Sequence, residues 1–245
     1  MNLSYLKRGT DAMKELENPV MSGGSSGKIL RFYLKKDQSA LLTFLDGSLL
    51  PMSETNGELV FDVPGTYEHS FMHEGVVADF ICTLESEGRC PLCDERKYRF
   101  YNLFFTAIDH RKNVSKQGKV FEYNKRIVAV NRDAYKMLLK FLDERIDPQL
   151  GFVGLQMQAE KVKAKSSMIG DFFKFRGYVD LDQLKAQGMD VEPLDFSKVL
   201  VYRNCETLEK MGFGKVQAGT FQNTPYENVD DSSELMPLDD DTIPF

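Results

Sequence analysis

Short runs of β-forming residues, separated by turn residues, occupy the first third of the chain. KILRFYLKK (28–36) and ALLTFLDG (40–47) are two such runs. The dipeptides Asp46-Gly47 and Asn56-Gly57 are typical of turns that join strands. The pattern therefore predicts strands from Lys28 to about Phe80.

Two further pairs of strands are predicted downstream. YRFYNLFFTAID (98–109) and KVFEYNKRIVAVN (119–131) flank a basic loop, and GFVGLQMQ (151–158) and MIGDFFKFRGYVD (168–180) flank a second basic segment. Between these pairs, apolar residues recur at helical spacing and predict a helix at about 132–146, which Asn131 or Asp133 can cap. A short helix is also expected near residues 206–211.

About six strands and one long helix favour a small barrel over a doubly wound sheet, because parallel strands need a crossover connection for each pair. We therefore expect a mainly β fold, an oligonucleotide-binding (OB) barrel, over residues 28–213. Residues 1–27 are expected to be an N-terminal arm, with a helix at 4–17 followed by the flexible linker SGGSSG. Residues 214–245 lack apolar periodicity and are expected to be a disordered acidic tail.

The formal net charge of −6 is unevenly distributed. Seven of the 37 acidic residues lie between Tyr226 and Phe245, where there is no Lys or Arg, so the rest of the chain is nearly neutral. Such a body can carry a basic binding surface for which the acidic tail competes. No segment approaches the ~20 apolar residues of a membrane span. The N-terminus lacks a secretory signal, so we expect a cytoplasmic protein.

Three of the four cysteines lie close together, at positions 82, 90 and 93, shortly after His69 and His73. The spacing of Cys90-Pro-Leu-Cys93 lets two thiolates bind one ion. With Cys82 and one histidine, the set predicts a single structural zinc ion in a subdomain at about residues 66–97, with no coordination position left open. The alternative is three buried cysteines without metal. His69 and His73 have the same strand parity, so alternation does not choose between them.

Aromatic and basic residues are interleaved in residues 95–105, 119–126 and 171–178. Single-stranded nucleic acid binds such surfaces, because bases stack on flat side chains while cations contact phosphates. The same aromatic residues could instead fill a barrel core. Taking the strand parity that carries Lys or Arg as the outer face, with the nearby basic residues, we predict nucleic-acid contacts by Arg99, Tyr101, Lys112, Phe121, Tyr123, Lys125, Arg126, Lys161, Lys163, Lys174 and Arg176.

Together these features resemble the single-stranded DNA-binding proteins of tailed bacteriophages, including the T-even type. The resemblance covers about residues 1–205 and is most specific at YEH (67–69), Cys82, CPLC (90–93) and FTAIDHR (105–111). Twelve residues separate His69 from Cys82, as in the T-even proteins, so the resemblance favours His69 as the fourth zinc ligand; the seven residues between Cys82 and Cys90 are fewer than in those proteins. It implies a protein that coats and protects single-stranded DNA during replication, recombination and repair.

The two ends of the chain resemble partner-binding segments. LKRGT (6–10), with Lys7 and Arg8, is similar to the basic segment through which the phage proteins bind neighbouring copies cooperatively. The last residues are similar to the tip of the bacterial single-stranded DNA-binding proteins, with Thr242 inserted; this resemblance implies docking of replication and recombination proteins on Asp239, Asp240, Asp241, Ile243, Pro244 and Phe245.

Two other classes of protein compete with this interpretation. A zinc-bearing adaptor would bind proteins through its sheet and tail and have no affinity for nucleic acid. An enzyme is disfavoured, because Asp109-His110 is the only remaining pair of catalytic type and no nucleophile motif accompanies it. We therefore expect a binding protein without enzymatic activity.

Overall fold

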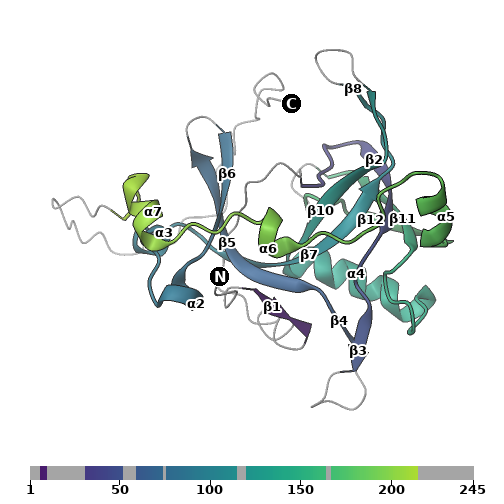
Figure 1. The fold of residues 1–245 in the computed structure, drawn as a ribbon, viewed down its shortest axis with the longest axis horizontal. Coiled ribbons are helices and arrows are strands. Elements are labelled where there is room, and N and C mark those ends of the chain that lie inside the picture. Colours follow the sequence, from purple (N-terminus) through teal and green to yellow (C-terminus); the bar gives the residue numbers. More distant parts are fainter. Residues whose placement is uncertain are drawn as a thin grey trace.

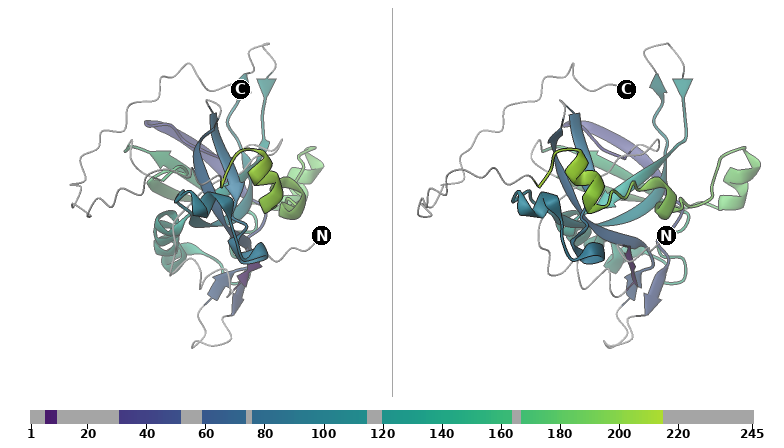
Figure 2. Two further views of the ribbon diagram at one scale, coloured as in Figure 1. Left: turned by 90° about the vertical axis from the view of Figure 1, so that its left-hand side faces the viewer. Right: turned by 60° about the vertical axis from the view of Figure 1, so that its left-hand side comes forward.

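The structure is a computed structural model that describes residues 6–9, 31–51, 59–73, 76–114, 120–163 and 167–214 (Figures 1 and 2). This part of the chain is mainly β, which confirms the predicted class. Its strands are β1 (Lys7–Arg8), β2 (Gln38–Phe44), β3 (Leu49–Pro51), β4 (Leu59–Phe61), β5 (Pro64–His73), β6 (Val76–Ile81), β7 (Phe100–Asp109), β8 (Asn113–Val114), β9 (Val120–Phe121), β10 (Asn124–Val130), β11 (Leu155–Lys161) and β12 (Phe172–Tyr178). Its helices are α2 (Leu84–Glu87), α3 (Pro91–Asp94), α4 (Arg132–Arg145), α5 (Leu181–Ala186), α6 (Phe196–Val199) and α7 (Cys205–Lys210).

Eight strands form one antiparallel sheet in the order β1-β5-β7-β2-β11-β12, with β10 paired to β7 and β6 paired to β5. The long strand β7 organises this sheet. It pairs with β10 over Leu103–Asp109, with β5 over Phe100–Leu103 and with β2 over Ala107–Asp109. β8 and β9 form a separate two-stranded arm that projects away from the sheet (Figures 1 and 2).

The described strands do not close into a barrel, so the expected OB closure is replaced by an open sheet. The segment 31–37 instead links β10 to β11 through single backbone hydrogen bonds. Phe32 N–H donates to the Ile127 carbonyl in β10 (2.8 Å), and Asp37 N–H donates to the Lys161 carbonyl in β11 (2.7 Å). This segment was predicted as a strand, but it has no continuous ladder partner among the described strands and forms an extended connection.

Both faces of β7 are buried. On one face, Phe105 packs in the main core against Phe61 and Phe152, with ring centroids 5.2 and 5.5 Å apart. On the other face, Phe104 packs against Phe196 of α6, and Ile108 belongs to a cluster with Leu184 of α5. The chain after β12 therefore covers the second face of β7. The sequence pattern did not predict this layer, because α5 and α6 are too short to show helical periodicity.

The long predicted helix is present as α4, which ends one residue earlier than expected. The side chain of Asn131 accepts a hydrogen bond from Ala134 N–H (3.0 Å) and caps its start. Tyr135 and Leu138 are buried against the core, as their spacing predicted. The short helix near residues 206–211 is also present, as α7.

The N-terminal arm differs from the expectation. Lys7 and Arg8 form the short strand β1, paired with Gly65 and Pro64, and are not part of a helix. The structure does not describe the other residues of 1–27 or the predicted tail beyond Gly214.

None of the helices in the described ranges combines the length and apolarity needed to cross a membrane.

Candidate metal centre and nucleic-acid face

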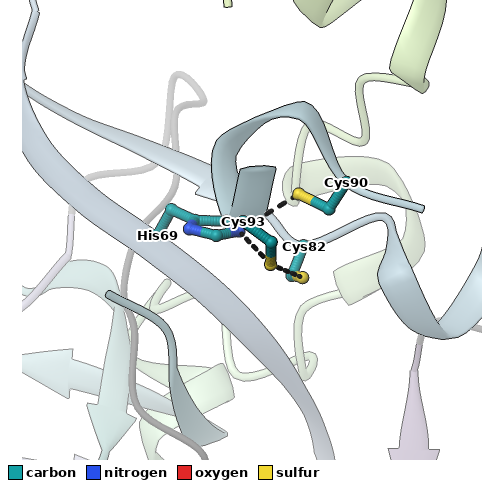
Figure 3. Close-up of side chains that lie close together, drawn as sticks. All are labelled: His69, Cys82, Cys90 and Cys93. Atoms are coloured by element: carbon teal, nitrogen blue, oxygen red, sulfur yellow. Dashed lines mark hydrogen bonds between the residues drawn. The ribbon is translucent and has the colours of Figure 1, made fainter. Parts of the chain in front are cut away.

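Four predicted metal ligands come together in the structure (Figure 3). Nε2 of His69 lies 3.2 Å from Sγ of Cys90 and 3.6 Å from Sγ of Cys93. The sulfurs of Cys82 and Cys93 are 3.6 Å apart, and all four ligand atoms lie within 4.8 Å of one another. The cluster can therefore hold a metal ion. His73 is not part of it, since its ring packs against Phe213.

Local structure explains how residues so far apart in sequence meet. His69 lies in β5 opposite Phe80 of β6, so the chain that leaves β6 brings Cys82 beside it. Gly88 ends α2 with a left-handed backbone (φ 69°), a conformation that costs glycine little. Cys90 then occupies the N-cap position of α3 without a side-chain capping hydrogen bond. The first residue of this helix is Pro91, and proline lacks only an N–H that the first turn does not use. Cys93 follows within the same helix and faces the same point.

The side chains of the cluster differ in how readily they lose a proton. Hydrogen bonds with Cys82 and Cys93 lower the pKa of Cys90, while the same contacts with Cys82 and Cys90 raise the pKa of Cys93. Burial lowers the pKa of His69, but hydrogen bonds to Cys82 and Cys90 outweigh it and raise this pKa to about 9. A metal ion that binds here therefore displaces protons from the cluster.

Arg99 was predicted to contact nucleic acid, but the structure places it beside the cysteines. Its side chain is only 12% exposed. Nη1 donates to Sγ of Cys82 (3.6 Å) and to Oε1 of Glu85 (3.1 Å), and the guanidinium lies over the ring of Tyr67. Arg99 is therefore not on an exposed face as its parity predicted, because the chain passes the Cys3His cluster just before β7 begins.

Two other predicted nucleic-acid contacts are buried. Tyr101 is 1% exposed and packs edge-on against Tyr67, with ring centroids 5.0 Å apart. Lys161 is 6% exposed, on the face of β11 that also carries the buried Met157 and Ala159. The rule that the parity carrying Lys or Arg points outward fails at Tyr101, because both faces of β7 are buried. Lys161, which was predicted only as a nearby basic residue, lies on the core face of β11.

Lys125 and Arg126 of β10 are engaged in ion pairs within the protein. Nζ of Lys125 lies 2.6 Å from Asp190 and donates to the carbonyl of Glu192 (2.6 Å). Nε of Arg126 lies 3.8 Å from the fully buried Asp109, and burial lowers the pKa of this guanidinium. Both side chains are at most 15% exposed. They join β10 to β7 and to the segment after α5, and they are poorly placed to contact a ligand.

The outer face of β12 carries two of the predicted residues and one exposed aromatic residue besides. Lys174 and Arg176 are exposed and share their face with Phe172, which is 52% exposed. Lys174 also forms an ion pair with Glu160 of β11 (2.9 Å). Phe172 was not among the predicted residues, although its strand parity is that of Lys174 and Arg176 and could have identified it. Lys163, just beyond β11, is exposed as well.

A second exposed aromatic residue, Tyr123, lies between β9 and β10 and is 46% exposed. Its backbone is left-handed (φ 53°), which is unusual for a residue other than glycine. The ring of His110 packs edge-on against it at 5.4 Å, and Nε2 of His110 lies 2.7 Å from Oγ1 of Thr43. Lys112 is exposed nearby and pairs with Glu122, whereas the side chain of Phe121 lies outside what the structure describes.

No protein-family model, curated protein or solved structure matches this chain. Fold and site together define a mainly β protein with an open antiparallel sheet and a Cys3His cluster that can hold a metal ion.

Proposed function

We propose that the protein binds single-stranded DNA on the outer face of β12 and around Tyr123, and that one structural zinc ion occupies the Cys3His cluster. The main support for DNA binding is one face of β12, where an exposed aromatic ring lies on the same strand face as two exposed cations, Phe172 with Lys174 and Arg176. Bases of a single strand can stack on such a ring while its phosphates contact the cations. In duplex DNA the bases are already stacked and paired.

Zinc is supported by the donor set and by its spacing. Three sulfurs and one imidazole nitrogen are a ligand set typical of structural zinc. Zn–S bonds of about 2.3 Å and a Zn–N bond of about 2.0 Å in a tetrahedron place neighbouring ligand atoms roughly 3.5 to 3.8 Å apart. The contacts of 3.2 to 3.6 Å among these side chains are close to that range. With four protein ligands, the ion would stabilise the fold and would not activate water.

Titration with a labelled oligonucleotide tests DNA binding. We expect the protein to prefer single-stranded to duplex DNA, with an affinity that falls steeply with salt because bound phosphates release counterions. Phe172→Ala should weaken binding by about 1–3 kcal/mol, the contribution of one stacking platform. Tyr98→Ala is the matched control, because Tyr98 is 74% exposed but lies in the segment between α3 and β7 and not on β12. Equal affinity for duplex DNA, or no binding at low salt, would contradict the proposal and favour the adaptor.

The acidic residues of 226–245 are proposed to compete with DNA for the basic face. Tethered acids act at high effective concentration on a nearby cationic surface. Deleting residues 226–245 should therefore tighten binding to single-stranded DNA, most strongly at low salt where screening is weakest. The measurement is the ratio of the two affinities across a salt series. A ratio that does not change with salt would show that the acids do not compete.

Partner binding remains a proposal carried by the resemblances of the two ends. Residues 239–245 lie outside the described residues. At the other end, Arg8 is exposed, and its Nη1 lies 3.9 Å from the carboxylate of Asp62. A surface ion pair of this length contributes little to stability, so Arg8 can leave Asp62 and bind a neighbouring copy of the protein at little cost. Sedimentation of the protein on long single strands, with Arg8→Gln as the comparison, tests this self-association.

A further inference from the structure

The metal cluster has a cationic neighbour of its own. Three thiolates and one divalent ion carry a net charge of −1, and this charge lies largely buried, since Cys82 and Cys90 are each 1% exposed. An uncompensated buried charge is costly unless a hydrogen bond or an opposite charge reaches it. Arg99 is placed to supply both, with Nη1 3.6 Å from Sγ of Cys82.

Three contacts from different elements fix the orientation of this guanidinium. Cys82 follows β6, Glu85 belongs to α2 and accepts a hydrogen bond at 3.1 Å, and Tyr67 of β5 lies under the guanidinium plane at 4.2 Å. A planar guanidinium can stack flat on a ring while its N–H groups donate in fixed directions, whereas an ammonium group has no plane to stack and its donors rotate freely. The side chain is 12% exposed, which keeps water from replacing these contacts.

His69 shows why the outer contacts of this cluster matter. A metal-bound histidine normally donates its second ring N–H to a neighbouring acceptor, which orients the ring. Nδ1 of His69 is buried and has no hydrogen-bond partner among the described residues. The hydrogen bond from outside the cluster is therefore made to a sulfur ligand, Sγ of Cys82, and not to the histidine ring.

We propose that Arg99 is a positioning residue of the metal centre, whose hydrogen bond to Cys82 stabilises the metal-bound thiolate and slows release of the ion. This inference rests on the proposed occupancy of the cluster by a divalent metal. An N–H donor withdraws electron density from a thiolate, so the sulfur is less readily protonated or attacked. The same bond ties the loop after β6 to the residue that precedes β7.

Release of zinc to an excess of a colorimetric chelator tests the proposal. Arg99→Gln should accelerate release by about 10- to 100-fold, the usual effect of losing an outer-sphere partner. Arg99→Lys should give an intermediate rate, because it keeps the charge and loses the planar contacts. Lys97→Gln is the matched control: Lys97 lies two residues away, over the ring of Phe71, and should release zinc at the wild-type rate.

Cobalt substitution provides a readout that a general loss of stability would not move. The thiolate-to-cobalt charge-transfer band should shift in Arg99→Gln and stay in place in Lys97→Gln, because only Arg99 donates to a ligating sulfur. Equal release rates and equal bands for wild type and Arg99→Gln would overturn the role of Arg99. A wild-type protein that takes up neither zinc nor cobalt would instead overturn the proposed metal occupancy itself.

Discussion

Replacing Cys90 with serine is expected to abolish metal binding and to lower the thermal stability of the protein sharply. Cys90 is buried, and its sulfur lies 3.2 Å from Nε2 of His69, so no other described side chain can take its place in the set. A structural zinc ion contributes on the order of 10 kcal/mol to a small domain. Elemental analysis and a thermal melt measure the two effects.

Cys205→Ser is the control for this substitution. Cys205 contacts Thr83 beside the cluster but is not one of its four members. Its replacement should leave the metal content at about one ion per chain. If Cys90→Ser protein lost the metal and kept an unchanged melting curve, the ion would have no structural role.

Tyr101→Ala is expected to cost about 3–5 kcal/mol of stability, as the loss of a large aromatic side chain from a core does. The ring is almost fully buried against Tyr67. A Cβ on Gly65 would lie 2.7 Å from the side chain of Tyr101, so the tyrosine packs directly against the backbone of the neighbouring strand β5. Urea unfolding measures the effect. Tyr98→Ala, an exposed tyrosine three residues earlier, should change stability by less than about 0.5 kcal/mol.

This expectation reverses the role that the sequence predicted for Tyr101. A base-stacking residue would weaken DNA binding when replaced and leave stability unchanged. A folded Tyr101→Ala protein with wild-type stability would contradict the buried position of this ring.

The comparison of sequence and structure shows where strand parity is informative. It identified Lys174 and Arg176 because the outer face of β12 is open to solvent. It failed for Tyr101 because the face of β7 that has the parity of Arg99 is the face that packs in the main core, where Tyr101 lies against Tyr67. The parity of a strand separates its two faces but does not show which of them is exposed when both are covered.

The Cys3His cluster and α4 were predictable for different reasons. Cys90 and Cys93 are close in sequence, so their spacing alone indicates a shared ion, and the resemblance to the phage proteins favoured His69. The helix α4 is long enough for its apolar periodicity to be clear. The role of Arg99 could not be predicted, because it depends on where β6, α2 and β7 meet in space.

The contacts behind the metal cluster have a consequence for how the chain folds during synthesis. Arg89 is paired with Glu209, 120 positions later, and Ser86 hydrogen-bonds Tyr202 (2.6 Å). Helices α3 and α7 lie side by side at this end of the molecule (Figure 1). At about 5–20 residues per second, the ribosome needs roughly 6 to 24 s to deliver α7 after the last cysteine ligand has been made. The ligands can gather round an ion in that interval, but the surface of the loop that α7 covers stays open to chaperones and to other nascent chains until α7 has been made.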